Sequence, residues 1–300
     1  MNGQTREGSP LAPPPTADGD PASAAQALTG VSRTLLIPLL ARAQAASLWP
    51  ESGFSDPTAR ATIEQLAVTH NGIATDPFPM RLCISRSMAL QRQLRELLAQ
   101  PLDRRLVLLA CGLDTLPYRL HSGLDPAAQK RLRGWICADL PAVMSVRERV
   151  LPAAADTANL VARLPDDLAA VAEHLDATRP VFILEGVLPY LPPDQVRRSL
   201  DALATIVPAG ADLLLDSYHP ALLAFSRLGN TFRRLRTEFH FAAKDPRAYT
   251  GMNPRIRFHQ QQNLLRSMPW RLRKRTLLPS LFAAGKPLAT LVHLEIVPKS

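Results

Sequence analysis

Four short apolar runs in this sequence each end at a glycine or an acidic residue, and helical stretches separate them. The runs are residues 106–110, 134–138, 180–184 and 211–215. Short apolar runs that alternate with helices are typical of a parallel sheet covered on both faces. Ligands of such sheets bind at the carboxyl ends of the strands. In this chain those ends carry Cys111-Gly112, Asp139, Glu185 and Asp216.

The remaining periodic stretches predict further helices and strands. Residues 31–49 indicate a short helix that is interrupted at Pro38, because proline lacks the amide hydrogen of a helix interior. Apolar spacing predicts helices over residues 56–69, 82–99, 144–151, 166–174 and 195–206. Weaker strand patterns cover residues 159–164, 273–278 and 291–297.

Composition indicates one globular domain after a short tail. Of the 300 residues, 46% are hydrophobic, which is enough for a sizeable core. Residues 1–30 are rich in Pro, Ala, Gly and Ser and are expected to be a disordered tail, which leaves residues 31–300 as the domain. We find no apolar run of membrane-spanning length and no signal-peptide core, so we expect a cytoplasmic protein without a membrane partner.

The cysteines argue against a disulfide framework and against a structural metal site. Cys83, Cys111 and Cys137 are odd in number, and no two of them have the C-x-x-C spacing of a zinc site. We therefore expect no metal.

The first strand and its loop predict a nucleoside-type ligand other than NAD. A dinucleotide site needs the pattern G-x-G-x-x-G, but positions 110, 112 and 115 are Ala, Gly and Thr. The acid that binds a ribose is nevertheless present, as Asp139. A ligand with a ribose and no pyrophosphate fits better, and S-adenosylmethionine is the common one.

Basic residues concentrate in one segment of the chain. Between Arg227 and Arg275 there are 13 Lys or Arg against two acids, whereas the whole chain has a net charge of +9. A solvated face is one interpretation of this segment, and an anion-attracting wall beside the site is the other. On the second interpretation, residues 218–275 form a basic lid.

Four motifs resemble the leucine carboxyl methyltransferase family of class I methyltransferases, in the branch that methylates oxygens in polyketide synthesis. They are Thr34 to Ala43, Cys111 to Thr115 with Tyr118 to Leu120, Asp139-Leu-Pro followed by Val143 and Arg147, and Glu185 to Leu191. The resemblance covers residues 33–220 well and the C-terminal third loosely. It implies a Rossmann-like sheet of about seven mostly parallel strands, with a helical N-terminus and an inserted lid.

The resemblance also implies roles for individual residues. Asp139 would accept hydrogen bonds from the ribose hydroxyls, and Gly112 would let the methionine part pass close to the backbone. Their neighbours Leu140 and Cys111 are also expected to bind the cofactor. Arg86 would pair with the methionyl carboxylate. The other positions are Glu185 near the ligand's amino group, Arg163 and Leu164 beside the adenine, and Tyr190 toward the acceptor.

The chain departs from the family pattern at four positions. Ala110 stands for the first glycine of the loop, Leu116 for an arginine, Gln91 for an acid, and Arg163 for the acid beside the adenine. An alternative function is therefore a non-catalytic binding protein with a methyltransferase fold. Methylation of a tRNA side chain is a second alternative, which the basic segment permits, although we do not expect a nucleic-acid partner.

The resemblance implies transfer of a methyl group to an oxygen of a small anionic molecule. A carboxylate acceptor is already ionised at neutral pH and needs no general base, which suits a chain without an obvious catalytic histidine. For a phenol acceptor, His219, His240 or His259 would be the candidate base. The expected acceptor is a carboxylate of a polyketide-like or other secondary metabolite.

Overall fold

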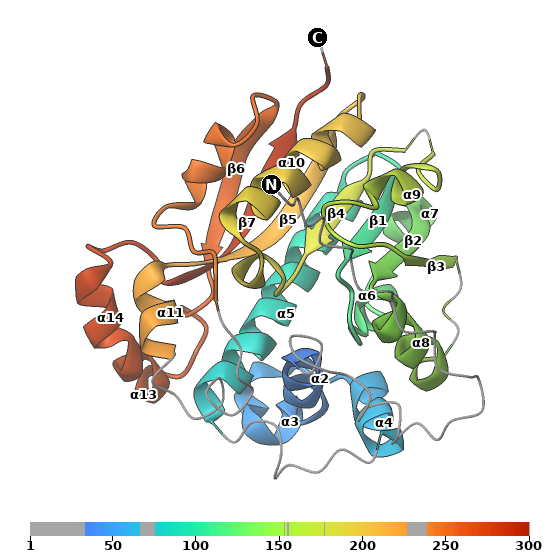
Figure 1. Cartoon of the computed structure of the whole chain (residues 1–300). Coiled ribbons are helices and arrows are strands. Elements are labelled where there is room, and N and C mark those ends of the chain that lie inside the picture. The colour runs from blue at the N-terminus through green and yellow to red at the C-terminus, as the bar shows by residue number, and fades with distance from the viewer. Residues whose placement is uncertain are drawn as a thin grey trace, which may run out of the picture.

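The centre of the molecule is a seven-stranded sheet with the strand order β3-β2-β1-β4-β5-β7-β6 (Figure 1). The computed structural model describes residues 34–66, 76–152, 154, 156–176, 178–226 and 239–299. Strands β1 to β5 pair in parallel, and β7 runs antiparallel to both β5 and β6. The predicted seven-stranded, mostly parallel α/β sheet is confirmed. The strands are β1 (Arg104–Leu109), β2 (Leu132–Asp139), β3 (Thr157–Val161), β4 (Val181–Leu184), β5 (Ala211–Tyr218), β6 (Ile256–Asn263) and β7 (Ala289–Ile296).

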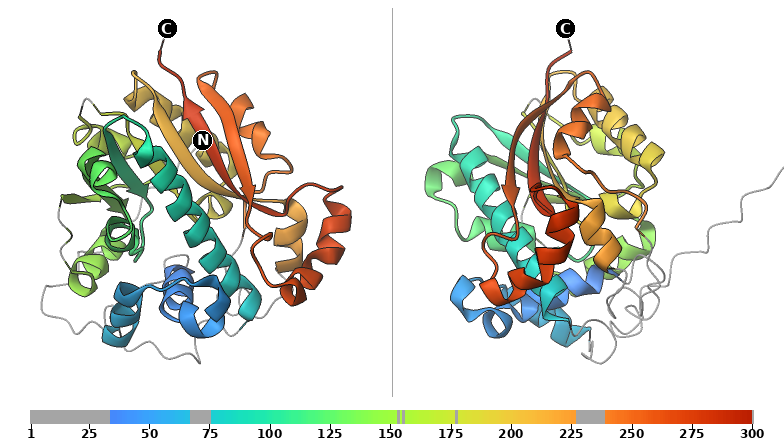
Figure 2. Two further views of the ribbon diagram at one scale, coloured as in Figure 1. Left: turned by 180° about the vertical axis from the view of Figure 1, so that it is seen from behind. Right: turned by 90° about the vertical axis from the view of Figure 1, so that its left-hand side faces the viewer.

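Helices cover both faces of the sheet. Helix α5 crosses the face seen in Figure 2, left, and α10 lies on the opposite face, seen in Figure 1. The α-helices are α2 (Leu36–Ala43), α3 (Ala45–Leu48), α4 (Pro57–Gln65), α5 (Pro77–Ala99), α6 (Leu116–His121), α7 (Pro126–Arg131), α8 (Pro141–Val150), α9 (Leu168–Ala172), α10 (Pro193–Ile206), α11 (Pro220–Ser226), α13 (Trp270–Arg273) and α14 (Leu277–Phe282). Short 3₁₀ helices are η2 (Pro50–Ser52), η4 (Leu188–Tyr190), η5 (Pro246–Gly251) and η6 (Lys274–Thr276).

The two sides of the sheet form separate cores because successive side chains of a strand point to opposite faces. In β1, Leu106 and Leu108 pack with the α5 side, whereas Val107 and Leu109 pack with the α10 side. Residues 106–109 of β1 and 181–184 of β4 are therefore apolar on both faces, which explains why their sequence shows runs rather than alternation.

Asp-Pro pairs set the starts of three helices. Asp56, Asp76 and Asp125 each accept a backbone N–H of the first turn of α4, α5 and α7, and proline follows each of them. The aspartate satisfies a helix N–H that has no partner within the helix, and proline has no N–H to lose there. The cap at Asp76 starts α5 five residues before the predicted boundary at 82.

The expected interruption at Pro38 is wrong. Helix α2 begins at Leu36, so Pro38 lies in its first turn, where amide hydrogens have no acceptor within the helix. The proline therefore removes no hydrogen bond. The break comes later, at Gln44, between α2 and α3.

The strand predicted at residues 273–278 is also wrong, because these residues belong to α13, η6 and α14. The edge strand of the sheet is instead β6, at residues 256–263, whose polar sequence carries no strong apolar pattern. The third strand begins at residue 157, two residues before its predicted start, and the helix expected over 166–174 is limited to α9.

The expected disordered tail and part of the expected lid lie outside the described residues. Residues 1–30 lie outside the described residues, as do residues 227–238 of the predicted lid. Strand β6 belongs to the central sheet, so the span 218–275 is not a lid along its whole length. No described helix is long and apolar enough to cross a bilayer. The cytoplasmic location stays a prediction.

Candidate functional site

A cavity of about 700 Å³ lies at the carboxyl ends of β1, β2, β4 and β5. It has the position in which open α/β sheets bind their ligands. All nine residues that the sequence singles out line this cavity, although they come from five separate segments. They are Arg86, Cys111, Gly112, Asp139, Leu140, Arg163, Leu164, Glu185 and Tyr190.

The loop after β1 is held against the end of β2 by Asp139. One oxygen of this carboxylate accepts the N–H of Gly112 at 2.7 Å, and the other accepts the N–H of Leu140 at 2.7 Å. Burial raises the pKa of Asp139, although the bond from Gly112 opposes that rise. Each oxygen retains a further lone pair, so Asp139 can still accept a hydroxyl of a ligand.

Two residues of this loop have positive φ angles. Gly112 has φ +51° and Ala110 has φ +50°. The left-handed conformation costs a residue with a Cβ about 1–2 kcal/mol, whereas glycine adopts it freely. Ala110 therefore adopts the left-handed conformation that a glycine would adopt without strain, and its backbone is strained as a result.

We expect Ala110→Gly to raise the free energy of unfolding by about 0.5–1 kcal/mol, because relief of the strain exceeds the added entropy of the unfolded chain. Urea unfolding measures this change. The matched control is Ala284→Gly at the exposed Ala284, which has φ +48° and lies outside the cavity. The control should stabilise the protein equally, and a loss of stability in Ala110→Gly would contradict the assignment.

The side chain of Cys111 belongs to the core and not to the cavity floor. Its Sγ donates to the sulfur of Met144 at 3.7 Å, and its backbone N–H donates to the carbonyl of Ala138. Burial raises the pKa of its thiol well above the usual value. Cys111 can therefore contribute to the cavity through its backbone.

Arg86 lies in the wall of the cavity and is already bound to two carboxylates. Its Nε donates to Glu185 at 2.8 Å, and its Nη1 donates to Asp216 at 2.7 Å and to the hydroxyl of Tyr218 at 3.0 Å. The pairing with a methionyl carboxylate that the resemblance implies is thus not available from Nε and Nη1. Its Nη2 takes no part in these three bonds.

Glu185 presents an unsatisfied acceptor in this wall. Its Oε1 accepts from Arg86, but its buried Oε2 has no hydrogen-bond partner among the described residues. Burial raises the pKa of Glu185, and Arg86 opposes that rise. A buried oxygen without a donor is costly, so a cationic ligand group placed there would satisfy it.

Asp216 and Tyr218 were not among the predicted site residues. Asp216 accepts the hydroxyl hydrogen of Tyr218 at 2.6 Å and the N–H of Gly186 at 2.8 Å, so it ties β5 to the loop after β4. The one sequence signal for Asp216 was its position as an acid directly after the predicted strand 211–215. Only the pairing of β4 with β5 brings that acid to Arg86.

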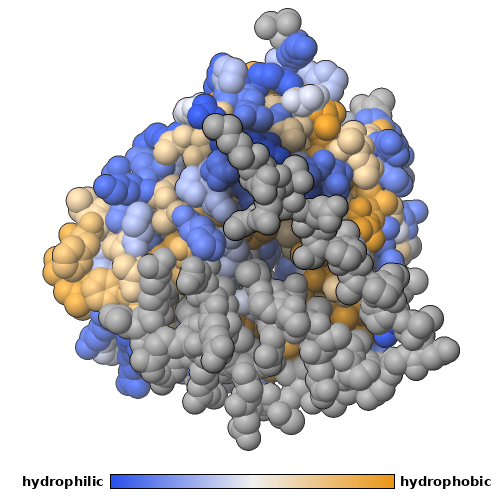
Figure 3. Space-filling model, viewed as in Figure 1, coloured by the Kyte–Doolittle hydropathy of each residue, from blue (hydrophilic) through white to orange (hydrophobic). Residues whose placement is uncertain are grey.

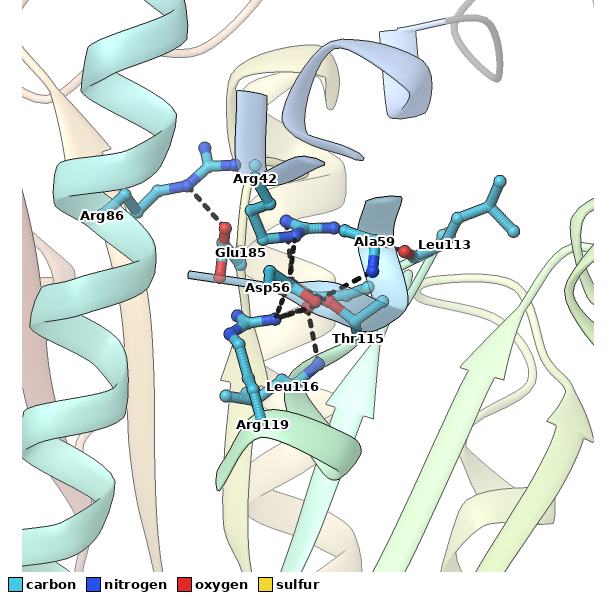
Figure 4. Close-up of polar contacts among 12 residues, drawn as sticks. Arg42, Asp56, Ala59, Arg86, Leu113, Thr115, Leu116, Arg119 and Glu185 are labelled. Carbon is cyan, nitrogen blue, oxygen red and sulfur yellow. Dashed lines mark hydrogen bonds and ion pairs between the residues drawn. The ribbon is translucent and has the colours of Figure 1, made fainter. Parts of the chain in front are cut away.

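A buried ionic cluster fixes the loop after β1 to the N-terminal helices (Figure 4). Asp56 and Asp114 face Arg42 and Arg119, at 2.8 Å for the pair Asp114–Arg119 and 3.5–3.6 Å for the others. The hydroxyl of Thr115 donates to Asp56. We call Arg42, Asp56, Asp114, Thr115 and Arg119 the loop clamp.

The charges within the loop clamp depend on one another. Burial acts to raise the pKa of Asp114, but Arg119 and Arg42 outweigh burial and hold it well below its usual range. From the other side, Arg147 of α8 donates to the carbonyls of Gly112 and Asp114. The resemblance pointed to Arg147 and Asp114, but not to Arg42 or Asp56 as their neighbours.

Tyr190 contacts the cavity through its ring, which stacks on Phe239 with centroids 5.4 Å apart. Burial raises the pKa of Tyr190 to about 12, and a hydrogen bond with Thr34 only partly opposes this rise. Its phenol is therefore neutral at physiological pH and is poorly suited to act as a general base.

Arg163 lines the cavity, and its place beside the adenine stays a prediction. The nearby acids Asp166 and Asp167 lie outside its lining: Asp166 pairs with Arg198, and Asp167 accepts the backbone N–H of Arg163. Among the described residues of the cavity lining, the loop after β3 contributes no carboxylate beside Arg163.

The basic segment contributes little to the cavity. Among its described basic residues, only Arg275 lines the cavity, where it pairs with Asp76 at 2.8 Å. None of His219, His240 and His259 belongs to the lining. The expected wall of arginines is thus wrong for residues 239–274. In the described residues, no group of three His, Cys, Asp or Glu could hold a metal ion.

Comparison with known proteins gives a consistent result. The family model for leucine carboxyl methyltransferase matches residues 36–204. The tetracenomycin polyketide synthesis O-methyltransferase TcmP of Streptomyces glaucescens is 28% identical over 244 residues, which cover 80% of this chain and 85% of TcmP. A provisionally assigned S-adenosyl-L-methionine-dependent methyltransferase from Mycolicibacterium gilvum is 28% identical over 57% of this chain and 62% of its own length.

Solved structures share the fold. A provisionally assigned methyltransferase from Thermobifida fusca YX superposes with a TM-score of 0.57, with 18% identity over 90% of this chain and 95% of its own. A protein of the DUF574 family from Streptomyces avermitilis superposes with a TM-score of 0.53, with 13% identity over 86% of this chain and 97% of its own.

Proposed function

The chain belongs to the leucine carboxyl methyltransferase family, and on that premise we propose that it transfers a methyl group to a carboxylate of a small molecule. Its class is that of the S-adenosylmethionine-dependent methyltransferases. TcmP is named for O-methylation in polyketide synthesis, which supports a secondary metabolite as the acceptor.

The residues of the cavity fit S-adenosylmethionine. The buried Oε2 of Glu185 has no donor of its own, which suits the ammonium of the methionine part. Asp139 would accept the ribose hydroxyls, and Nη2 of Arg86 would donate to the methionyl carboxylate. When bound, S-adenosylmethionine would supply an electrophilic methyl carbon on a sulfonium, with S-adenosylhomocysteine as the neutral leaving group when an oxygen takes the methyl. Ala110 and Gly112 would face it with the turned backbone of the loop.

The lining of the cavity supports an acceptor that is ionised before it binds, and this observation carries the proposal. The described lining contains no histidine. Its two tyrosines are weak acids, because burial raises the pKa of both Tyr190 and Tyr218. Of its four acids, Asp139 and Glu185 are assigned to the cofactor, and Asp76 and Asp114 pair with Arg275 and Arg119. A carboxylate has no proton to remove, since its pKa lies near 4.

The remaining work of the chain is positioning and exclusion of water. Apolar side chains of α11 and of the N-terminal helices dominate the acceptor side, including Leu222, Leu223 and Ile37. Arg163 and Arg275 are cations in the same lining and would attract an anionic acceptor.

We expect methyl transfer to aromatic carboxylic acids and not to their methyl esters. The assay uses S-adenosylmethionine with a tritium-labelled methyl group and measures volatile methanol released from the product by mild alkali. Because the acceptor is ionised throughout, the rate should change little between about pH 6 and pH 9. Transfer restricted to phenols, with a rate that rises with pH, would instead indicate a base-assisted reaction.

Calorimetric titration with S-adenosylmethionine separates this proposal from a non-catalytic binding protein. Heat of binding without methyl transfer to any of the carboxylic acids or phenols tested would favour the non-catalytic binding protein. Absence of heat at millimolar ligand would overturn the assignment of the cavity.

A further inference from the structure

An exposed apolar corner projects from the side of the molecule at α13 and α14. Leu281, Phe282, Leu277, Trp270 and Leu278 expose 77%, 69%, 64%, 55% and 53% of their surface. We call these five residues the apolar tip. Figure 3 shows hydrophobic residues gathered at this edge of the molecule, over α14. Contiguous exposed apolar side chains of this size mark an interaction surface.

Cations surround the apolar tip. Arg271, Arg273, Lys274 and Arg275 are all exposed, and residues 246–294 contain nine Lys or Arg and no acid. The ammonium of Lys274 lies 4.2 Å from the centre of the Trp270 ring. Arg275 is paired with Asp76, but the ion pairs of the described residues include none for Arg271, Arg273 or Lys274. The surface is thus both apolar and positively charged.

We propose that the apolar tip docks the protein peripherally onto an anionic lipid surface. Tryptophan, leucine and phenylalanine beside Lys and Arg are the composition of segments that lie in a membrane interface. The tip is a projecting corner (Figure 1), which a deformable lipid surface can accept without a complementary pocket. Acidic headgroups would attract the surrounding cations.

A second copy of the chain is a poorer occupant of this surface. A symmetric contact would bring two sets of the same cations together, since a twofold interface uses the same patch on both subunits. The segment supplies no acid to pair with them. An anionic partner avoids this repulsion.

The apolar tip adjoins the methyl-transfer cavity. The ring of Phe282 contacts that of Phe225 with centroids 6.2 Å apart, and Phe225 lines the cavity. Arg275, Thr276 and Pro279 of the same helical corner also line it. A docked protein would therefore hold its cavity beside the lipid. The sequence expectation of no membrane partner rested on spanning segments, which peripheral docking does not require.

Sedimentation with vesicles tests the proposal on the full chain. Wild type should sediment with vesicles of phosphatidylcholine and phosphatidylglycerol, should bind phosphatidylcholine vesicles weakly, and should dissociate as salt is added. The double variant L281D/F282D should lose at least about tenfold in vesicle affinity, because two large apolar side chains no longer enter the lipid. Leu102→Asp is the matched control, since Leu102 is 41% exposed and lies outside α13 and α14.

Tryptophan emission gives a second readout at the tip itself. Trp49 and Trp135 are only 5% and 3% exposed, so a shift on vesicle addition reports Trp270. We expect a shift to shorter wavelength with anionic vesicles. Trp270→Phe should abolish the shift and still sediment.

Other outcomes would overturn the proposal. These are a failure of wild type to bind either kind of vesicle, and a loss of affinity in Leu102→Asp as large as that in L281D/F282D. A wild-type dimer that L281D/F282D converts to a monomer, without vesicle binding, would make the tip an interface between copies. Thermal unfolding of each variant distinguishes a lost surface from a lost fold.

Discussion

Replacement of Asp56 by alanine should lower the free energy of unfolding by about 3–5 kcal/mol, because it removes a buried ion-pair partner and leaves Arg42 and Arg119 to share Asp114 alone. The side chain of Asp56 is 1% exposed and lies 3.6 Å from Arg42 and 3.5 Å from Arg119. It also caps α4 through the N–H of Ala59. Guanidinium chloride unfolding, followed by circular dichroism, measures the loss.

Two further variants separate the effects of charge, helix capping and burial at Asp56. Asp56→Asn keeps the capping oxygen and removes the charge, so it should fall between wild type and Asp56→Ala. Asp166→Ala breaks the exposed pair with Arg198, in which the side chains are 50% and 58% exposed, and should cost at most about 1 kcal/mol. Equal losses in Asp56→Ala and Asp166→Ala would contradict the importance of burial in the loop clamp.

Glu185→Gln should weaken binding of S-adenosylmethionine by about 10- to 100-fold, the value of a charge-assisted hydrogen bond. The glutamine carbonyl can still accept from Arg86, but its amide group would then face the ligand ammonium with a second donor. Isothermal titration calorimetry with S-adenosylhomocysteine, which carries the same ammonium, measures the change without turnover.

The pH dependence of binding gives an independent check on Glu185. Burial raises its pKa, so as the pH falls toward that raised value the carboxylate takes up a proton and the affinity should fall. Glu185→Gln should show a smaller dependence, with the remainder assigned to Asp139, whose pKa burial also raises. The exposed Glu173→Gln is the control and should behave as wild type. An unchanged affinity in Glu185→Gln would remove this residue from the cofactor site.

The cavity could be predicted because its key residues follow directly after predicted strands. Gly112, Asp139 and Glu185 each stand at the end of an apolar run, and strands of one direction bring their ends together. The loop clamp could not be predicted, because Asp56 and Thr115 are 59 residues apart and nothing local marks them as neighbours. The hydrogen bonds of Arg86 to Asp216 and Tyr218 could not be predicted for the same reason, because these partners lie far away in the sequence, on β5.

The sequence by itself determined the parallel part of the sheet, the edge at which the site lies and the family. Those features depend on apolar periodicity and on residues at fixed places next to each strand. Only the tertiary structure decided that residues 273–278 are helical, that β6 forms the edge, and that the apolar tip stays exposed. Those outcomes depend on which distant segments pack together. A leucine is buried where another segment covers it and exposed where none does, and the local sequence is the same in both cases.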